Sequence, residues 1–543
     1  MMKVFFTLLA AILVSYASQA QSYASLADRA QDKLHNSFRN SGGTYYIENS
    51  GTSNTYFHYW WNAHALDVLV DAYIRTNDSK YVARINTLVN NWSTNNGGSI
   101  YKDYYDDMEW LALSLFRAYE ETGNNTFLNM STDIWDDIKT GQNSNQGGGI
   151  AWRKSQLDYK NTPANAPAII YACRRHQMWG HSWELSLATD LYNWLKSTLR
   201  ESSGRINDGI NRQGSSQIDY WQFTYNYGVF IGAALEMYQS TNNAAYLNDA
   251  IATADYAIAT TDIMDNGIFR NEGGGDGALF KGILARYLAL LAQEPAVPLT
   301  KRNTYQTVLQ AQAEAIYTNG FNWTHNLIGE SWTQAPGSTT WMSAQLSGIM
   351  MLEVAAELGF TAPTPPAVLY QDCNGGGYSV SLGVGSYAMA DLQALGVTND
   401  DISSVDVASG YSLTMYRDYN FTGGSITKTS NDACLVDDGF NDDISSVVVS
   451  QSGARISGPV VVQENREMMV YPNPVTIGDQ LQFDFDGSSD VYEIQLLDLM
   501  GREVFSHAVV DSKYKMSTVG VKAGTYIVRI RGGSVFTSKV LIK

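Results

Sequence analysis

Residues 101–121 read YKDYYDDMEWLALSLFRAYEE, an aromatic and acidic turn that leads into a long apolar helix. Apolar residues recur at helical spacing in roughly twelve such segments between residues 22 and 360. Twelve helices in six hairpins predict an (α/α)6 barrel, in which each pair supplies one inner and one outer helix. A helical solenoid would show a fixed repeat period, which these segments lack. The segments begin near Ala24, His58, Lys80, Asp107, Asn125, Ala164, Ser182, Tyr227, Ala244, Ala278, Lys301 and Met342.

Tryptophan is distributed unevenly along the chain. All 13 tryptophans lie between Trp60 and Trp341, so an aromatic-rich module precedes one without tryptophan. The formal charge of −18 gives no electrostatic support to nucleic-acid binding. The aromatic content instead favours a neutral ligand that stacks on ring faces.

The first 20 residues have the order of a secretory signal: a basic residue, the apolar run FFTLLAAILV, and small residues ending at Ala20. No later stretch reaches 18 apolar residues, so no transmembrane segment is expected. In an exported chain Cys373 and Cys434 could form a disulfide. Cys173 lies in an apolar helical run and is expected to be a buried thiol. The chain has no CxxC pair, so a thiolate metal site is not expected.

Two breaks divide the rest of the chain. APTPPA (362–367) holds three of the 11 prolines and predicts a stiff linker, beyond which the apolar period is two, as in strands. NDDISSV occurs at 399–405 and again at 441–447, which indicates a duplicated β unit. The predicted organisation is a signal peptide (1–20), a helical barrel (21–361), a linker (362–367), a duplicated β domain (368–452), a second linker (453–468) and a small β-sandwich (469–543).

Asp106 and Asp107 are the strongest catalytic candidates. They are adjacent at the start of an apolar helix and have Tyr104, Tyr105 and Trp110 around them. Carboxylates at this position are also typical of ordinary helix capping. A glycosidase, however, needs one protonated and one ionised carboxyl group, and repulsion between neighbouring carboxylates separates their pKa values. Adjacent residues of a regular helix diverge, so both could serve one sugar only at a junction between loop and helix, which is where they are expected.

Other polar and aromatic residues could contribute to a site. The run YFHYWWNAHALDVLVDAY (56–73) is rich in large rings, of which one or two could form a sugar platform and the rest pack in the core. His64 and Asp67 could pair on one helix face. Glu272 and Asp276 lie in a glycine-rich loop that lacks the ending of a phosphate-binding P-loop. The chain has no HExxH or GxSxG motif and no Cys–His arrangement, so metalloprotease and serine-hydrolase chemistry are excluded.

The helical module resembles glycoside hydrolase family 76, the α-1,6-mannanases, over about residues 25–360. YYDDMEW is its most specific element, and further likeness lies in HYWWNAHALDVLVDAY, YKNTPANAPAII, FTYNYG and DGALFKGILARYL. The resemblance implies an (α/α)6 barrel and retaining hydrolysis of α-1,6-mannosidic bonds in mannan backbones. It also implies that Asp106 is the nucleophile and Asp107 the acid/base, with no cofactor for catalysis. We expect substrate contacts from Trp61, His64, Asp67, Tyr105, Trp152, Tyr227, Lys281 and Trp332.

The second module resembles a βγ-crystallin domain. LYQDCNGGGYSVSL and MYRDYNFTGGSIT are similar to its two Greek-key starts, although Gly375 stands where the first copy should carry an aromatic residue. The two NDDISS copies match the calcium motif of that family, and hard oxygen ligands suit Ca²⁺. Without calcium they would be solvated acidic turns. The implied calcium ligands are Asn399, Asp400, Ser403, Asn441, Asp442 and Ser445. Cys373 and Cys434 are expected to brace this domain.

The last module is similar to the C-terminal sorting domain of type IX secretion substrates, through MVYPNPV, LLDLMGREV and AGTYIVRIRGG…SKVLIK. This resemblance implies secretion or surface attachment in a Gram-negative, Bacteroidetes-type bacterium, with the type IX secretion machinery as a partner. We expect a monomer that acts on α-1,6-linked mannan or manno-oligosaccharides. Two alternatives stay open: another (α/α)6 carbohydrate-active enzyme, such as an inverting glycosidase or a lyase, and a surface glycan-binding protein without catalysis.

Overall fold

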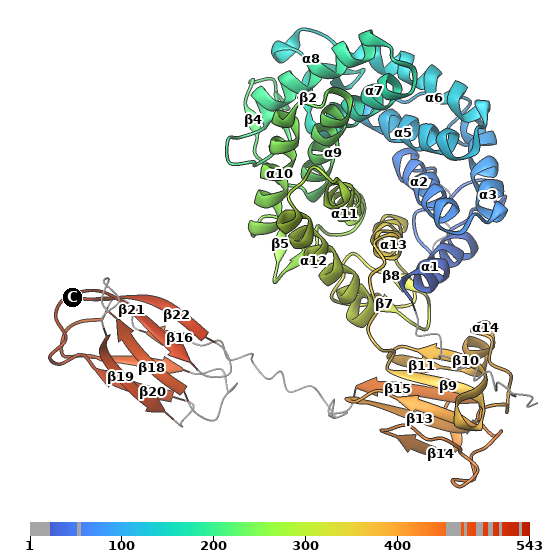
Figure 1. Ribbon diagram of the computed structural model, residues 1–543, viewed down its shortest axis with the longest axis vertical. Coiled ribbons are helices and arrows are strands. Elements are labelled where there is room, and N and C mark those ends of the chain that lie inside the picture. The colour runs from blue at the N-terminus through green and yellow to red at the C-terminus, as the bar shows by residue number, and fades with distance from the viewer. Residues whose placement is uncertain are drawn as a thin grey trace, which may run out of the picture. The chain divides into compact units, whose positions relative to one another are not determined.

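The computed structural model describes residues 22–51, 56–451, 469–471, 475–484, 492–497, 503–509, 513–531 and 535–543 (Figure 1). The predicted signal peptide and second linker lie outside these residues. The chain divides into two compact units at residues 454 and 455, and each unit has its own hydrophobic core. The first unit comprises a helical barrel and a β domain, and the second is a small β-sandwich.

Twelve long helices of the described chain form the barrel (Figure 1). The inner helices contact one another in a closed ring: α2 (Tyr59–Thr76), α5 (Tyr105–Thr122), α7 (Ala166–Trp179), α9 (Thr224–Thr241), α11 (Gly277–Gln293) and α13 (Met342–Glu357). The outer helices are α1 (Tyr23–Ser37), α3 (Ser79–Asn90), α6 (Asn125–Ile138), α8 (Ser182–Leu199), α10 (Ala244–Ala259) and α12 (Leu299–Ala315). One further turn, α4 (Trp92–Asn95), follows α3. The predicted (α/α)6 barrel is confirmed.

Side-chain patterning decides which helices lie inside. A helix that is apolar on all sides must be buried, whereas one apolar stripe suits a helix that faces water. In α13 every residue from Met342 to Ala355 is buried, and α9 is buried without a break from Asn226 to Met237. The outer helix α3 buries only Tyr81, Ile85, Leu88 and Val89, which lie on one face.

Inner and outer helices alternate strictly along the chain, so all six inner helices run in the same direction. Their N-termini therefore meet at one end of the barrel and their C-termini at the other. Small sheets occupy the loops between helices. The largest contains β1 (Ala151–Arg153), β2 (Gln156–Asn161), β3 (Gly209–Ile210) and β4 (Ile218–Asp219) in that order. Two hairpins, β5–β6 (Met264–Asp265, Ile268–Phe269) and β7–β8 (Phe321–Asn322, Leu327–Ile328), complete the described loops.

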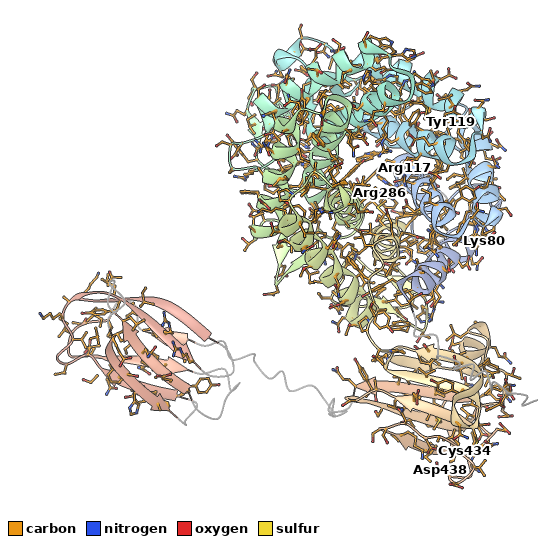
Figure 2. All side chains as sticks on the ribbon, in the orientation of Figure 1. Lys80, Arg117, Tyr119, Arg286, Cys434 and Asp438 are labelled. Carbon is orange, nitrogen blue, oxygen red and sulfur yellow. A yellow bond between two sulfur atoms is a disulfide. The ribbon has the colours of Figure 1, made fainter. Side chains whose placement is uncertain are left out.

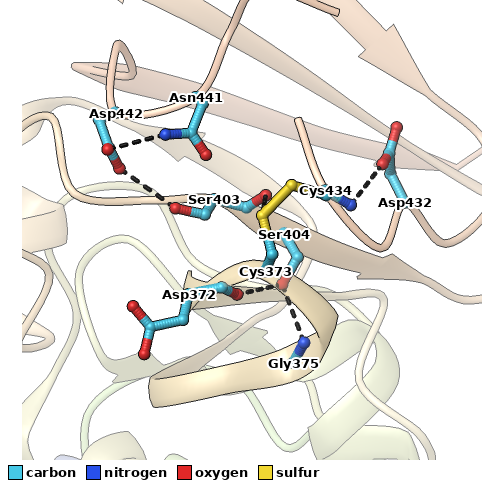
Figure 3. Close-up of a disulfide and its surroundings, with 9 residues drawn as sticks. All are labelled: Asp372, Cys373, Gly375, Ser403, Ser404, Asp432, Cys434, Asn441 and Asp442. Atoms are coloured by element: carbon cyan, nitrogen blue, oxygen red, sulfur yellow. Dashed lines mark hydrogen bonds between the residues drawn. A yellow bond between two sulfur atoms is a disulfide. The ribbon is translucent and has the colours of Figure 1, made fainter. Parts of the chain in front are cut away.

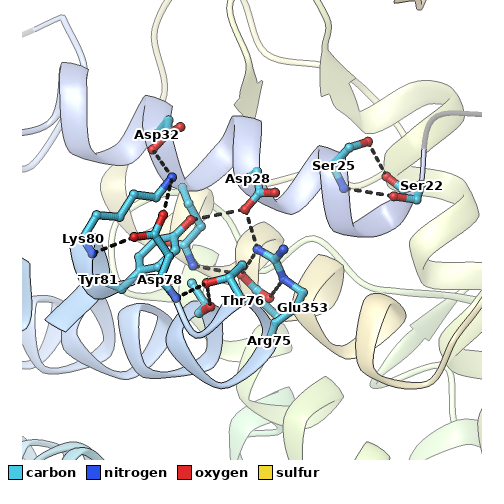
Figure 4. A network of polar contacts seen from close by, with 12 residues as sticks. Ser22, Ser25, Asp28, Asp32, Arg75, Thr76, Asp78, Lys80, Tyr81 and Glu353 are labelled. Carbon is cyan, nitrogen blue, oxygen red and sulfur yellow. Dashed lines mark hydrogen bonds and ion pairs between the residues drawn. The ribbon is translucent and has the colours of Figure 1, made fainter. Parts of the chain in front are cut away.

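Ion pairs tie the inner helices together toward their C-termini. Arg117 of α5 and Arg286 of α11 point into the ring (Figure 2), and both bind Asp67 and Asp71 of α2. The Arg117 Nη2 to Asp71 Oδ1 distance is 2.6 Å. A second cluster joins three helices through Arg75 of α2, which donates to Glu353 of α13 at 2.7 Å and to Asp28 of α1 at 2.8 Å (Figure 4).

The β domain consists of two sheets that exchange strands. The first has the order β10 (Gly376–Leu382), β9 (Ala367–Asp372), β12 (Ser404–Val407), and the second β11 (Gly385–Tyr387), β15 (Ser446–Gln451), β13 (Tyr411–Asp418), β14 (Thr422–Lys428). β11 from the first repeat pairs in the sheet of the second. Asp432, from the second repeat, bridges to Val405 in the sheet of the first. A short helix, α14 (Met389–Ala394), follows β11. The duplicated β unit predicted from the sequence repeat is confirmed.

The barrel and the β domain share one hydrophobic core. Arg29 of α1 lies over the Trp323 ring, with its Cζ 5.3 Å from the ring centroid, and donates to the Trp323 carbonyl at 3.0 Å. Trp323 in turn packs against the backbone of Gly383, whose carbonyl accepts a hydrogen bond from the buried Tyr387 hydroxyl. Thr324 donates across the boundary to the Ser386 carbonyl at 3.2 Å. The two parts are therefore joined by packing as well as by the chain.

The C-terminal unit is a sandwich of two antiparallel sheets. One contains β16 (Met469–Tyr471), β17 (Gln480–Asp484) and β20 (Lys513–Ser517). The other contains β19 (Glu503–Val509), β18 (Tyr492–Leu497), β21 (Gly524–Arg531) and β22 (Val535–Ile542). Buried side chains such as Leu481, Ile494 and Val528 form its core. Among the described residues of the whole chain, no helix is both long and apolar enough for a membrane span.

The contact between Gly383 and Trp323 leads to a stability prediction. A Cβ atom at Gly383 would lie 2.1 Å from the indole ring. We expect Gly383→Ala to displace the ring or the turn and to lower the free energy of unfolding by about 1–3 kcal/mol, as overpacking does. Gly337→Ala is the matched control, because no atom lies within 4 Å of its added Cβ. Urea unfolding followed by tryptophan fluorescence tests this, and equal stability of both variants would contradict tight docking of the two parts.

Candidate active site

A cleft lies at the end of the barrel where the inner helices begin, with a cavity volume of about 480 Å³. Residues at or near the N-termini of α2, α5, α9 and α11 form most of its wall. The residues that line it are Tyr56, His58, Tyr59, Trp60, Lys102, Asp103, Tyr104, Asp106, Asp107, Trp110, Trp152, Tyr225, Asp276 and Phe280. The cleft is therefore aromatic, with four carboxylates and one lysine.

Asp106 and Asp107 lie in the first turn of α5 and both face this cleft. The carboxylate of Asp106 accepts two hydrogen bonds, from Trp152 Nε1 at 2.9 Å and from the Asp107 amide at 2.9 Å. Asp107 has no side-chain hydrogen bond to any described residue. The N-cap residue Tyr104 makes no capping bond, so Asp106 provides the only side-chain acceptor for an amide of this turn among the described residues. Helix capping therefore accounts for part of the role of Asp106 and none of that of Asp107.

The two carboxyl groups titrate as a coupled pair in a poorly solvated place. Burial raises the pKa of Asp106 to about 7, against which the bonds from the Asp107 amide and Trp152 act. Burial also raises the pKa of Asp107 well above its usual range, and the charge of Asp106 raises it further. Among the described residues, hydrogen-bond donors stabilise the anion of Asp106 and not that of Asp107, so Asp106 is the first of the two to ionise.

Besides the pair and Asp103, one more carboxylate lines the cleft. Asp276, the N-cap residue of α11, accepts hydrogen bonds at Oδ1 from Trp60 Nε1 at 3.0 Å and from Trp61 Nε1 at 2.8 Å. These bonds connect the starts of α2 and α11 across the ring. Glu272, the other acidic residue of this loop, instead accepts from the Thr224 amide at 3.0 Å and so holds the start of α9.

Another acidic residue, which does not line the cleft, lies beneath the pair. Glu109 is one helical turn after Asp106 and is almost completely buried. Neither of its carboxyl oxygens makes a hydrogen bond of ordinary geometry with a described residue. Burial raises its pKa well above the usual range, the charge of Asp106 raises it further, and the nearby Ala168 amide opposes both in part. Glu109 therefore keeps its proton to a higher pH than an exposed glutamate does.

The structure places the predicted substrate-binding residues in several different regions. Trp152 lines the cleft and Trp61 contacts its rim through Asp276. The others lie away from the cleft wall. Tyr105, Tyr227 and Trp332 are buried in the core, and Lys281 is buried with its ammonium group donating to the Glu330 carbonyl.

His64 and Asp67 lie deeper in the barrel and line a separate cavity of about 220 Å³ that extends toward the C-termini of the inner helices. They do not pair with each other. Burial lowers the pKa of His64 to about 3, so its imidazole is neutral, and neither ring nitrogen has a partner among the described residues. Asp67 binds Arg117 and Arg286. The ring of Trp110 lines both cavities and lies between them.

Several cleft residues were not predicted from the sequence as substrate contacts. Tyr225 and Phe280 stack with their ring centroids 4.0 Å apart, and Trp60 lies 6.2 Å from Phe280. Each is in the first turn of an inner helix or close to it. The signal that could have identified them is this position, because the first turns of parallel inner helices converge on one end of the barrel.

The two NDDISS copies of the β domain interlock next to the disulfide between Cys373 and Cys434, which confirms the predicted pairing (Figure 3). Ser403 donates to Asp442 Oδ1 at 3.2 Å, and Ser445 donates to Asn399 Oδ1 at 2.9 Å. Each serine therefore reaches the acidic turn of the other copy. Within the described residues no cluster of three or more His, Cys, Asp or Glu side chains could hold a metal ion, so any ion here would need amide, hydroxyl or backbone oxygens as well.

The barrel and its cleft define a class of protein: an (α/α)6 barrel with a carboxylate pair in an aromatic cleft is the architecture of a carbohydrate-active enzyme. Residues 6–364 match the model of glycosyl hydrolase family 76, and the chain belongs to that family. Residues 469–543 match the secretion system C-terminal sorting domain, so the protein is secreted or held at the outer cell surface of a Bacteroidetes-type bacterium.

Similar proteins include an α-1,6-mannanase, GH76A of Salegentibacter sp. HEL1_6. An inactive variant of that enzyme, with two consecutive aspartates replaced, was solved in complex with α-1,6-mannotetrose. It is 36% identical, with a TM-score of 0.60 over 62% of this chain and 100% of that chain. The Lin0763 protein of Listeria innocua is also 36% identical, with a TM-score of 0.59 over 62% of this chain and 98% of its own. Mannan endo-1,6-alpha-mannosidase DFG5 of Saccharomyces cerevisiae is 26% identical over 201 residues, 33% of this chain. The chain spans less than two-thirds of the length of the curated relatives it matches, and 43% of DFG5.

The burial of Glu109 predicts a pH-dependent stability. Above the ordinary pKa of a glutamate the native state keeps a proton that the unfolded chain loses, so stability falls by about 1.4 kcal/mol per pH unit until the native group also ionises. Glu109→Gln removes this loss. We expect its free energy of unfolding, relative to the original protein, to increase between pH 5 and pH 8 in urea titrations. Glu121→Gln, an exposed change on the same helix, is the control. Parallel pH dependences of the original protein and Glu109→Gln would contradict the assignment.

Proposed function

We propose that this protein is an endo-acting glycosidase that hydrolyses α-1,6-mannosidic bonds in mannan backbones with retention of configuration. The observation that carries the proposal is the pair Asp106 and Asp107 at the wall of an aromatic cleft, with hydrogen-bond donors on only one of the two. The names of the yeast relative and of the Salegentibacter enzyme support the substrate. The acidic cleft also suits a neutral polymer better than the uronates on which a lyase would act.

The unequal surroundings of the two carboxyl groups support different roles for them. Asp106, whose anion accepts from Trp152 and from the Asp107 amide, is the nucleophile. Asp107, whose pKa is raised by burial and by the charge of Asp106, keeps its proton and is the general acid. The position at a helix N-terminus also stabilises the negative charge of the nucleophile.

Hydrolysis proceeds in two displacements. Asp107 donates its proton to the glycosidic oxygen as the Asp106 carboxylate attacks the anomeric carbon, so the bond to the leaving sugar breaks and a mannosyl ester forms. The Asp107 carboxylate then takes a proton from water, whose oxygen attacks the anomeric carbon and releases Asp106. The stacked rings of Tyr225 and Phe280 and the indole of Trp60 offer apolar faces to the sugar rings.

Neutralising either aspartate tests the mechanism. We expect Asp106→Asn and Asp107→Asn each to lower kcat on debranched α-1,6-mannan by about 10²–10⁴-fold or more, because each removes a group that acts in the transition state. Asp190→Asn, on the exposed side of α8, should keep full activity. Reducing-end release with product sizing measures cleavage, and the anomer of the first product, followed by NMR, distinguishes retention from inversion. Full activity of both folded variants would favour a glycan-binding role for the cleft, and an inverted product a different enzyme mechanism.

We also propose that the β domain binds Ca²⁺ through its two NDDISS turns. The side-chain atoms that would ligate the ion are all oxygens, which suits Ca²⁺. Asp400 and Asp442 occupy equivalent left-handed positions, with φ of 54° and 52°. Asn441 Oδ1 is buried and has no hydrogen-bond partner among the described residues, and a cation would satisfy it. Asn399, Asp400 and Ser445 would form one site, and Asn441, Asp442 and Ser403 the other.

Calcium titration of the full secreted chain tests this second proposal. We expect isothermal calorimetry to show two Ca²⁺ sites and thermal unfolding to shift upward with Ca²⁺, since a ligand that binds only the native state stabilises it. Asp400→Ser and Asp442→Ser should each remove one site, whereas Asp437→Asn, an exposed change in the same domain, should keep both. A chain that shows neither heat nor a shift in unfolding temperature with Ca²⁺ would contradict the proposal.

A further inference from the structure

An exposed tryptophan lies beside the cleft, in the segment between β4 and α9. Trp221 is 52% exposed, although its ring is large and apolar. One face of the indole is covered by the guanidinium of Arg212, whose Cζ lies 4.2 Å from the ring centroid. The exposed area is therefore on the side away from that guanidinium.

Arg212 is held in place by three neighbours. It donates to Asp208 at 3.1 Å, to Asp219 at 3.3 Å and to the Tyr159 hydroxyl at 3.0 Å. The two carboxylates compensate its charge, so Arg212 gives the surface around Trp221 no net positive charge for an anionic ligand. Fixing the indole before binding also reduces the entropy that a ligand would lose in ordering it.

Arg212 also connects Trp221 to the cleft. The same guanidinium lies 5.9 Å from the ring centroid of Trp152, which lines the cleft and donates to Asp106. On the other side, Phe223 lies 6.1 Å from Trp221 and 5.4 Å from Phe280. Aromatic rings thus extend without a gap from the cleft wall to the exposed indole.

We propose that Trp221 is an outer subsite, where the exposed face of the indole stacks on a hexose unit of the glycan beyond those held in the cleft. The ligand class is a neutral mannosyl residue of a chain that runs from Asp106 and Asp107 past Trp152. This proposal rests on the proposed function. The subsite would make the enzyme more efficient on long glycan chains than on short ones, because only a long chain reaches the indole of Trp221.

A second exposed tryptophan provides a matched control. Trp183 is 46% exposed, and Lys139 lies 4.7 Å from its ring centroid, so its size, exposure and cationic neighbour resemble those of Trp221. It lies in the first turn of the outer helix α8, which begins at the end of the barrel where the inner helices finish. A glycan in the cleft does not reach it.

The experiment compares kcat/KM on α-1,6-manno-oligosaccharides of increasing length and on the polymer. For Trp221→Ala we expect about a tenfold loss on the longest substrates, carried mainly by KM, and no change on the shortest substrate cleaved. Trp221→Phe should recover part of the loss, and Trp183→Ala should match the original protein at every length. Equal losses at all lengths, or no loss at any, would overturn the subsite. If the original protein cleaves no α-1,6-mannan, the proposed function itself fails, and that result is separate from the length profile.

Discussion

The direction of the six inner helices is the constraint on which the rest of the molecule depends. Because inner and outer helices alternate, every inner N-terminus arrives at the same end of the barrel. That end gathers the positive ends of the helix dipoles and the first-turn side chains of helices far apart in sequence. Asp106 of α5 and Asp276 of α11 meet there only because the ring is closed. The ion pairs of Arg117, Arg286 and Asp71 toward the opposite end hold that closure.

Much of the fold could be predicted from sequence periodicity. The twelve predicted helix starts fall within three residues of the observed ones, because an amphipathic or wholly apolar helix is encoded locally. The repeated NDDISSV likewise predicted a duplicated β unit. Periodicity could not show that β11 of the first repeat pairs in the sheet of the second, or that Gly383 packs against Trp323. Both depend on contacts between segments distant in sequence.

The candidate site was predictable only where local chemistry was unusual. Two adjacent carboxylates before an apolar helix are such a signal, and the structure places both in the cleft. Aromatic residues carry no comparable signal, because the same side chains also build the core. Tyr227 is buried, whereas Tyr225, two residues earlier on the same helix, lines the cleft. The two side chains are half a turn apart and so point to opposite sides of α9. Composition alone does not show which side of a helix faces the cleft.

Burial alone does not decide the pKa of an acidic residue in this barrel, because an ion pair with an arginine also shifts it. Asp71 is held by Arg117 and Arg286, which lower its pKa to about 2 despite burial, so it stays an anion that joins helices. Asp107 forms no ion pair with a cation of the described residues, and burial raises its pKa. The same residue type therefore stabilises the barrel as an anion at one end and holds its proton to a higher pH at the other. Arg117 and Arg286 lie toward the C-terminal half of the ring, where cations suit the helix dipoles, and their described ion pairs are with Asp67 and Asp71 rather than with Asp106 or Asp107.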